Sequence, residues 1–299
     1  MSYPSTFVKQ ETVLWPSLFC MQTHTLPRVM DMKIGLILAA GWLLVRSDTA
    51  MDAASLSCRL FVTGVLPGLL PYMVVTLMLV SRLKRPLRPW QLVLMGWCGG
   101  SPCGARLLRE AGDTPHRQRM AAACATMSPM FLLGTLGKWL GSSRAGMCIL
   151  LANLAGALLA SLLLPRKAGD TAPLPQPAPL SLGAAVEDTA RTLLTVCGIM
   201  AVMRVAAALL GEALVDFPAA ALIVTALLEV TAGTEAIVSL PLPLAWRTAL
   251  IAGATGLGGV SLLMQNRAVL RVMSLPRQLA VQVVHGGLTF LLALGMMAM

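Results

Sequence analysis

Apolar segments of about membrane-spanning length recur along most of this 299-residue chain. A helix needs about 20 mainly apolar residues to cross the hydrocarbon core of a bilayer. Windows of this kind fall at residues 60–81, 120–140, 145–165, 190–210, 246–265 and 278–299, with a shorter one at 33–45. The chain is 57% apolar and only 12% charged, whereas a soluble domain is about one-quarter charged. We therefore predict an all-α membrane protein with about seven transmembrane helices.

Two further apolar segments, residues 89–110 and 217–243, are interrupted by polar and glycine-rich residues. The first interruption contains Gly99-Gly100-Ser101-Pro102, and the second runs from Glu229 to Glu235. Irregular backbone at membrane depth is tolerated only where protein buries it or where it lines a cavity. Interrupted segments at corresponding positions of two halves point to the substrate site of a transporter.

The charges around these two segments predict that neither crosses the membrane. Basic residues lie on both sides of the first segment: Arg82, Lys84, Arg85 and Arg88 before it, and Arg106, Arg109, Arg117 and Arg119 in it or after it. Positive residues favour the cytoplasmic side, so the segment enters and leaves from the cytoplasm as a re-entrant helical hairpin. Both flanks of the second segment are poor in positive charge, which predicts a hairpin that enters from the outside.

The same order of elements then occurs twice with opposite orientation, which is an inverted repeat. The predicted domains are an N-terminal extension at 1–31, a first helix and first repeat at 32–165, a Pro-rich cytoplasmic linker at 166–183, and the second repeat at 184–299. Because the composition changes at Met32, we interpret Met32 as the true start of the protein. The alternative is that residues 1–31 form a short disordered cytoplasmic tail.

Several classes of function are disfavoured by composition. The net charge is +10, but the basic residues lie between apolar segments, and two Tyr and six Phe offer little surface for stacking bases. We expect no nucleic-acid partner. The seven Cys are odd in number and lie mostly in apolar runs, which argues against a disulfide framework or a metal site. No enzyme motif is present, so we expect neither catalysis nor a cofactor.

Five segments spread over residues 32–299 carry a family resemblance: residues 65–72, 100–106, 128–137, 228–233 and 258–265. At these residues the chain resembles the YlbJ-type sporulation integral membrane proteins, which contain a nucleoside-recognition (Gate) domain. The resemblance implies a multi-pass protein of the bacterial cell membrane, at the outer forespore membrane during sporulation, with a core similar to that of concentrative nucleoside transporters. It also implies transport of dipicolinate in endospore formation. Two alternatives stay open: a transporter of nucleosides or related small molecules, and a non-transporting membrane scaffold of a sporulation complex.

The predicted substrate site lies between the two interruptions and the broken spans that follow them. Amide groups at half-helix N-termini attract anions, and Arg106 either pairs with a carboxylate or anchors the segment at the interface. The predicted substrate-binding residues are Gly99, Gly100, Ser101, Gly104, Ala105, Arg106, Ser128, Thr231, Gly233, Thr234, Gly258, Gly259, Ser261 and Gln265.

Glu229 is the candidate for a coupling proton or cation, because an acid inside a membrane segment is costly and is a functional candidate by default. The alternative is that it only braces the hairpin. We expect Arg204 and Lys138 to extend toward the outer interface. The predicted partners are the lipid bilayer and a small anionic metabolite; we leave a homo-oligomer open.

Overall fold

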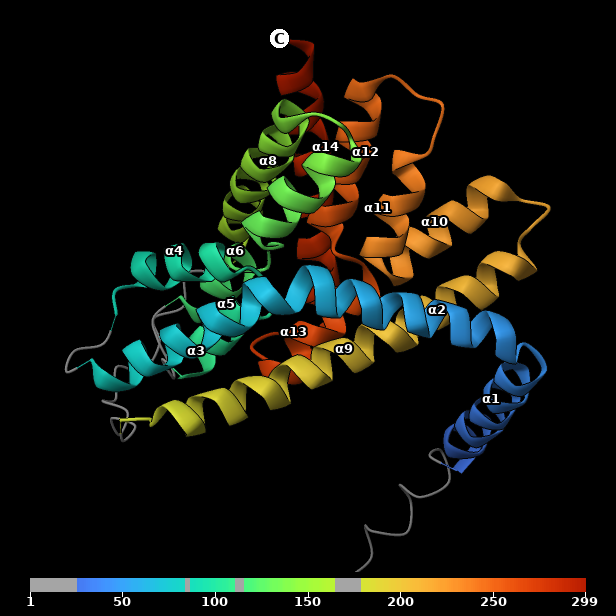
Figure 1. Cartoon of the computed structure of the whole chain (residues 1–299), viewed down its shortest axis with the longest axis horizontal. Helices are drawn as coiled ribbons and strands as arrows, with labels where there is room; N and C mark the ends of the chain where they lie inside the picture. The colour runs from blue at the N-terminus through green and yellow to red at the C-terminus, as the bar shows by residue number, and fades with distance from the viewer. Residues whose placement is uncertain (1–25, 84–86, 111–115, 165–178) are drawn as a thin grey trace, which may run out of the picture. The chain divides into compact units, whose positions relative to one another are not determined.

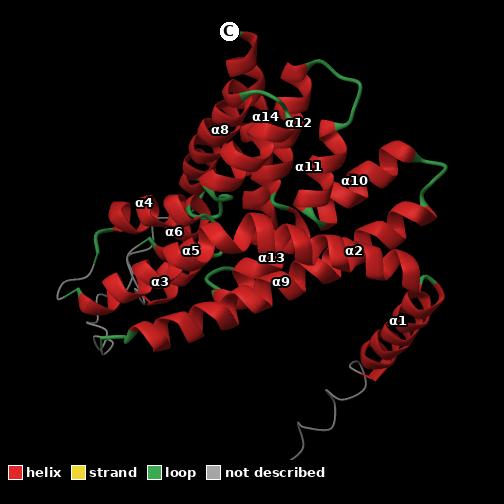
Figure 2. Ribbon diagram, viewed as in Figure 1, coloured by secondary structure: helices red, strands yellow, loops and turns green. Residues whose placement is uncertain are grey.

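The computed structural model describes residues 26–83, 87–110, 116–164 and 179–299, and no β-strand occurs among them (Figure 2). The chain divides into two compact units, residues 1–47 and 48–299. The first unit contains helix α1, Leu26–Val45. This helix continues across Met32, so the change in composition there is not a helix boundary. Residues 1–25 of the predicted extension lie outside the described residues.

The second unit is built from long helices, short helix pairs and a bundle. Its elements are α2 (Ser47–Leu60), the π-helical η1 (Phe61–Val65), α3 (Leu66–Arg82), α4 (Pro89–Gly99), α5 (Cys103–Glu110), α6 (Arg117–Ala123), the π-helical η2 (Met130–Leu136), α7 (Gly137–Trp139), α8 (Ser143–Leu162), α9 (Leu182–Ala213), α10 (Pro218–Leu228), α11 (Val230–Val238), α12 (Leu244–Leu257), α13 (Gly259–Val269) and α14 (Leu275–Ala298). Most of the predicted linker at 166–183 lies outside the described residues, although its last two positions begin α9.

Five helices are long and apolar enough to cross a membrane: Ser47–Arg82, Ser143–Leu162, Leu182–Ala213, Leu244–Val269 and Leu275–Ala298. They correspond to five of the seven predicted windows, so the protein is all-helical and membrane-embedded. The window at 33–45 coincides with Lys33–Val45, an apolar part of α1 that is shorter than these five helices. The window at 120–140 is divided between α6 and η2, because residues 124–128 leave the helical conformation before Pro129 begins the next element.

Two continuous helices exceed the thickness of the membrane. Ser47–Arg82 has 36 residues and Leu182–Ala213 has 32, which corresponds to about 54 Å and about 48 Å at 1.5 Å per residue. A hydrocarbon core is about 30 Å thick, so helices of this length are accommodated by tilting. Figure 1 shows α2, α3 and α9 lying crosswise to α8, α12 and α14 and below them in the view.

Small residues allow the three helices α8, α12 and α14 to approach closely. A Cβ atom added at Gly256 of α12 would lie 2.6 Å from Thr289 Oγ1 of α14, and one at Gly156 of α8 would lie 2.5 Å from the same atom. Close contact of backbones through glycine is a common way for helices to associate in lipid. The absence of a side chain at Gly156 and Gly256 therefore permits the close approach of α8 and α12 to α14.

Two clusters of buried apolar residues form the core. One contains Leu69, Leu92, Leu107 and Val196 and joins α3, α4, α5, α6 and α9. The other contains Leu136, Ile149, Ile237, Ile251 and Ala293 and joins η2, α8, α11, α12 and α14. The first interrupted segment contributes to the first cluster, through Leu92 and Leu107, and the second contributes to the second cluster, through Ile237.

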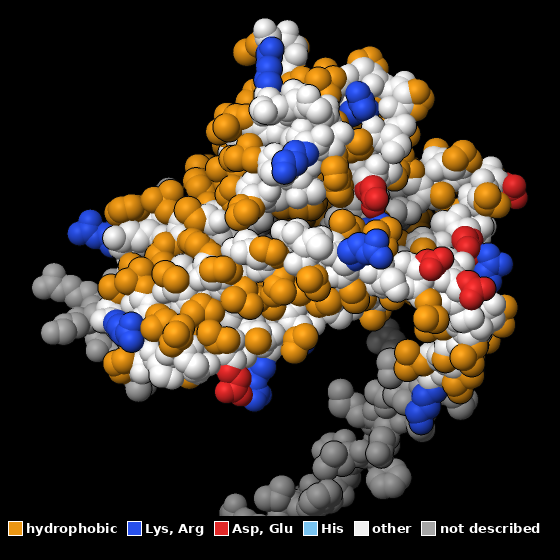
Figure 3. Space-filling view, viewed as in Figure 1, with side chains coloured by type: hydrophobic (Ala, Val, Ile, Leu, Met, Phe, Trp, Pro, Cys, Tyr) orange, Lys and Arg blue, Asp and Glu red, His pale blue; other side chains and the backbone are white. Residues whose placement is uncertain are grey.

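The surface of the described unit is strongly apolar. Leu194 and Val202 of α9, and Val283 and Leu291 of α14, are each more than 60% exposed. Figure 3 shows hydrophobic side chains over much of the visible face, with few charged ones among them. Soluble proteins seldom expose apolar surface of this extent, which is the pattern of a protein embedded in lipid.

Candidate functional site

The first interruption lies against the broken span that follows it. After α4 ends at Gly99, Gly100 adopts a positive φ of 68°, and α5 begins at Cys103. The backbone amide of Ser101 donates to the carbonyl of Thr126 at 2.6 Å. A Cβ atom at Gly100 would lie 2.3 Å from the backbone nitrogen of Ser128, so only glycine permits this approach.

The second interruption shows the same kind of contact with its own following span. α10 ends at Leu228, and Glu229 is the N-cap of α11. The span from α12 to α13 is broken at Gly258, whose φ is 72°. A Cβ atom at Gly259 would lie 2.9 Å from the carbonyl oxygen of Leu227. Each interrupted segment therefore packs against the break in the next span, in both halves of the protein.

A cavity lies where these breaks meet, which we call the central cavity. It has about 470 Å³ of empty space, part of which is open to the surroundings. Apolar side chains such as Leu69 and Phe131 form part of its wall. Its polar lining residues are Ser101, Ser128, Glu229, Thr231 and Gln265. The structure thus brings together five residues that the sequence selected from four separate segments.

The Glu229 side chain caps the N-terminus of α11. Its carboxylate accepts hydrogen bonds from the backbone amides of Thr231 at 3.1 Å and Ala232 at 2.7 Å, and the side chain is only 1% exposed. An N-cap carboxylate satisfies amides that have no partner within the helix and is favoured by the helix dipole. These two amides are therefore not free to bind an anionic ligand.

Arg204 lies between two carboxylates. Its guanidinium is 2.6 Å from Glu235 Oε2 and 3.9 Å from Glu229 Oε2. Our expectation that Arg204 extends to the outer interface is wrong, because the residue is 8% exposed and its charge is held by the two acids. Lys138, in contrast, is exposed. Three charges on α9 and α11 thus form one cluster at the edge of the central cavity.

Arg106 is also committed to a partner in the protein. Its side chain is 1% exposed, and its guanidinium donates to the carboxylate and the backbone carbonyl of Asp188 and to the hydroxyl of Thr192. Arg106 does not line the central cavity. In this arrangement it fixes α5 to α9, and its predicted role as an anion ligand stays a prediction.

The other predicted residues lie around the cavity and mostly serve close contacts. A Cβ atom added at Gly99 would overlap the Tyr72 ring, one added at Gly104 would overlap Cys124, and one added at Gly233 would overlap Ala226. The Thr234 hydroxyl donates to the Thr231 carbonyl at 2.9 Å, and Ser261 accepts from Gln265 at 3.0 Å. Ala105 lines a different pocket.

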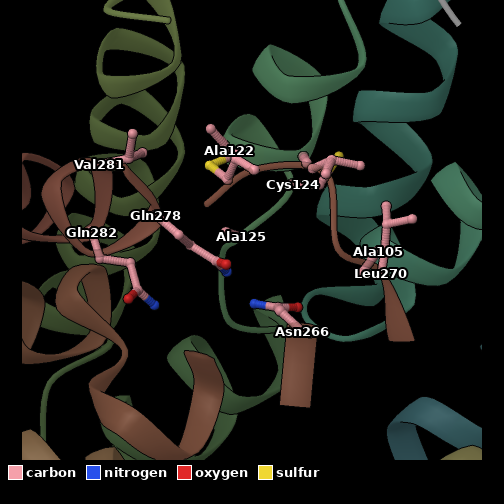
Figure 4. Close-up of a pocket in the computed structure, with 12 residues that line it drawn as sticks. Ala105, Ala122, Cys124, Ala125, Asn266, Leu270, Gln278, Val281 and Gln282 are labelled. Carbon is pink, nitrogen blue, oxygen red and sulfur yellow. The ribbon is translucent and has the colours of Figure 1, made fainter. Parts of the chain in front are cut away.

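A second pocket adjoins the first interruption and contains three carboxamide side chains. This carboxamide pocket is lined by Asn266, Gln278 and Gln282, and by small or apolar residues that include Ala105 and Cys124 (Figure 4). Its empty space is about 490 Å³, partly open to the surroundings. Ser101 of the central cavity donates a hydrogen bond to Asn266. This bond lies between the two cavities.

A third pocket adjoins the charged cluster. This acidic pocket is lined by Asp52 and Glu212 together with Arg204, Thr49 and Thr225, and has about 860 Å³ of space that includes open solvent. Glu212 accepts a hydrogen bond from Thr49 at 2.6 Å. Arg204 and Ala232 line this pocket, whereas Glu229 and Thr231 line the central cavity. Within the described ranges, no three His, Cys, Asp or Glu residues are grouped to hold a metal ion.

Several residues of this region carry no local signal in the sequence. Asp188, Asn266, Gln278 and Gln282 belong to helices that read as ordinary spans or span ends, and only the tertiary contacts bring them to the interruptions. Arg204 and Glu235 carried a signal, since both are charged residues within apolar segments.

Comparisons with known proteins identify no relative. No protein-family model matches the chain, and no curated protein or solved structure gives a significant match.

Proposed function

We propose that the protein is a membrane transporter that moves a small polar molecule through the central cavity. The observation that supports this is the meeting of four interrupted segments around one cavity, to which each of them contributes at least one polar side chain. Interrupted helices at membrane depth are stable only where protein or a cavity accommodates their free backbone groups. In transporters such breaks form the substrate site near the middle of the bilayer.

We further propose that the fold is an inverted repeat with two re-entrant hairpins, and that seven segments cross the membrane when α1 and the divided segment of α6 and η2 are counted. Corresponding elements of the two halves support this. α4 and α10 both have 11 residues and begin with proline, and each is followed by a short helix, α5 or α11. Each pair also packs against the break in its following span. The basic residues around the first pair favour the cytoplasmic side for it.

The three cavities suggest a route for the transported molecule. The Ser101–Asn266 hydrogen bond lies between the carboxamide pocket and the central cavity. The contact of Arg204 with Glu229 lies between the central cavity and the acidic pocket. We propose that these two polar contacts open in turn, which gives alternating access to a fixed central site.

Two classes of substrate are proposed for the central cavity. Family resemblance favours dipicolinate, carried in endospore formation. The charges of the site favour an uncharged molecule at the central cavity, because its lining contains one carboxylate and no Arg, Lys or His. The cations nearby, Arg106 and Arg204, are paired with acids. A nucleoside or related neutral molecule is therefore the second candidate.

Glu229 is proposed to bind the coupling proton or cation. The cluster of Glu229, Arg204 and Glu235 contains two acids and one base. Arg204 lies closer to Glu235, which is 45% exposed, than to the buried Glu229, so a positive charge or a proton compensates the Glu229 carboxylate. A buried charge without compensation is strongly unfavourable. The carboxylate also lines the cavity, which allows coupling between ion and solute occupancy.

The test is uptake by the purified full-length chain in liposomes. Radiolabelled dipicolinate and a nucleoside are compared, with and without an imposed pH or sodium gradient. Gradient-dependent uptake of either molecule supports a transporter and identifies the class of substrate. A chain that is folded in liposomes and takes up neither molecule under any gradient favours the membrane-scaffold alternative.

A further inference from the structure

The carboxamide pocket contains hydrogen-bond donors that the protein does not use. The Oδ1 atom of Asn266 accepts a hydrogen bond from Ser101, so its acceptor is engaged. Its Nδ2 atom is buried and has no partner among the described residues, although the side chain as a whole is 7% exposed. A buried donor without a partner is costly. An acceptor brought by a ligand would remove this cost.

Gln278 presents the same half of its carboxamide to the pocket. Its Oε1 atom accepts a hydrogen bond from Arg267 at 3.0 Å, which leaves its NH₂ group for other partners. Figure 4 shows the Gln278 and Asn266 side chains directed toward one another across the pocket. Two NH₂ groups, each on a carboxamide whose oxygen is already held, thus face a common space.

Gln282 supplies the third carboxamide. It is 7% exposed, and its side chain forms no hydrogen bond within the described part of the chain. The rest of the lining is apolar or small, and no lining residue is an acid or a base. The pocket therefore offers hydrogen-bond donors without a carboxylate that would repel an anion.

We propose that the carboxamide pocket binds an oxygen acceptor of the transported molecule, a carboxylate or an amide carbonyl, before the molecule reaches the central cavity. This inference rests on the proposed transport function and names a separate access site for it. The ligand oxygen accepts from Asn266 Nδ2 and the Gln278 NH₂ group, with Gln282 as a further donor. Because Asn266 also holds Ser101, occupancy of this site acts directly on the contact that separates the two cavities.

Two probes distinguish the sources of the acceptor. Pyridine-2,6-dicarboxylate carries two carboxylates, and pyridine-2,6-dicarboxamide has the same shape with two uncharged carbonyls. Equilibrium binding of each to the full-length chain in nanodiscs is measured by calorimetry. Binding of the dicarboxylate alone assigns the site to anions, whereas binding of both assigns it to carbonyl oxygens in general.

The variants change donors into acceptors at nearly constant volume. Asn266→Asp retains an oxygen for Ser101 but replaces the unpaired NH₂ group, and Gln282→Glu makes the same change at a residue that holds nothing else. We expect each to weaken binding of the dicarboxylate by about tenfold or more, since a lost hydrogen bond to a charged group is replaced by repulsion. Gln91→Glu is the matched control: it keeps the oxygen that accepts from the Arg88 amide, does not line the pocket, and should leave binding unchanged.

Parallel measurements separate this inference from the proposed function. Thermal unfolding first shows that each variant is folded, and Gln282→Glu carries the test if Asn266→Asp is not. Uptake together with binding that is insensitive to the variants overturns the site and leaves the transporter. Binding that is lost in the variants, without uptake by the wild type, supports the site and overturns transport. If neither probe binds the wild-type chain, the site is overturned.

Discussion

Arg106 in the first interrupted segment is paired with Asp188 near the start of α9, 82 positions later in the chain. The guanidinium is buried, while the Asp188 side chain is 46% exposed. The buried positive charge of Arg106 is therefore compensated by a carboxylate that is partly exposed at the protein surface. It attaches the first interrupted segment to the first helix of the second half.

Asp188→Asn should destabilise the fold by about 1–3 kcal/mol, because a buried charged donor loses its charged acceptor. Thr192 and the Asp188 carbonyl still accept from Arg106, which keeps the loss below that of an isolated buried charge. Thermal unfolding in detergent measures the effect. The neighbouring Glu187→Gln is the control: Glu187 and its partner Arg191 are 67% and 77% exposed, so the change should be small. Equal effects of both variants would refute the structural role of the Arg106–Asp188 pair.

Glu229→Gln should impair solute uptake by about tenfold or more while membrane insertion is retained. One amide oxygen of the new side chain can still accept from the start of α11, so the stability cost should be near that of a weakened cap, about 1 kcal/mol. Uptake into liposomes and thermal unfolding are measured on the same preparation. Glu235 pairs with the same Arg204 but does not line the central cavity. Glu235→Gln should therefore affect uptake less. An unchanged uptake rate in Glu229→Gln would remove Glu229 from the mechanism.

Gly100→Ala should lower stability by about 1–3 kcal/mol, because Gly100 has a positive φ and its added Cβ would overlap the Ser128 backbone. Gly134→Ala is the matched control, since nothing lies within 4 Å of the added atom. Detergent unfolding temperatures provide the comparison. If the two alanine variants unfold at the same temperature, the close approach of Gly100 to Ser128 is wrong.

Cysteine labelling tests the two re-entrant hairpins. Single cysteines replace Arg88 and Arg109 around α4 and α5, and Phe217 and Ser239 around α10 and α11, in a background without the native cysteines. All four positions are exposed. An impermeant thiol reagent should label the first pair only from the cytoplasmic side and the second pair only from the outside. Labelling of the two members of a pair from opposite faces would make that segment a transmembrane crossing and would end the inverted-repeat proposal.

Part of this architecture follows from local properties of the chain. Apolar segments of membrane length must form helices, since backbone polar groups in lipid have to be satisfied within the segment. Five predicted windows accordingly appear as long apolar helices. Gly99–Pro102 and Glu229 also marked the two interruptions correctly, because glycine, proline and a buried acid are costly in an uninterrupted membrane helix.

Other features depended on contacts between distant segments. A break in the window at 120–140 was predicted from the sequence, but its partner was not: the first interrupted segment packs against it, and the Ser101 amide donates to the Thr126 carbonyl. The partners of Arg106 and Arg204 lie on other helices, so no local pattern identified them.

The sequence by itself determined that the chain is helical, that it lies in a membrane, and where its helices are interrupted, because those properties depend on transfer of residues from water to lipid and on local backbone chemistry. The tertiary structure decided which charges are neutralised within the protein and which polar groups face a cavity. Electrostatic and hydrogen-bond partners act only at short range in space, and here they come from segments such as Ser101 and Asn266 that are 165 positions apart.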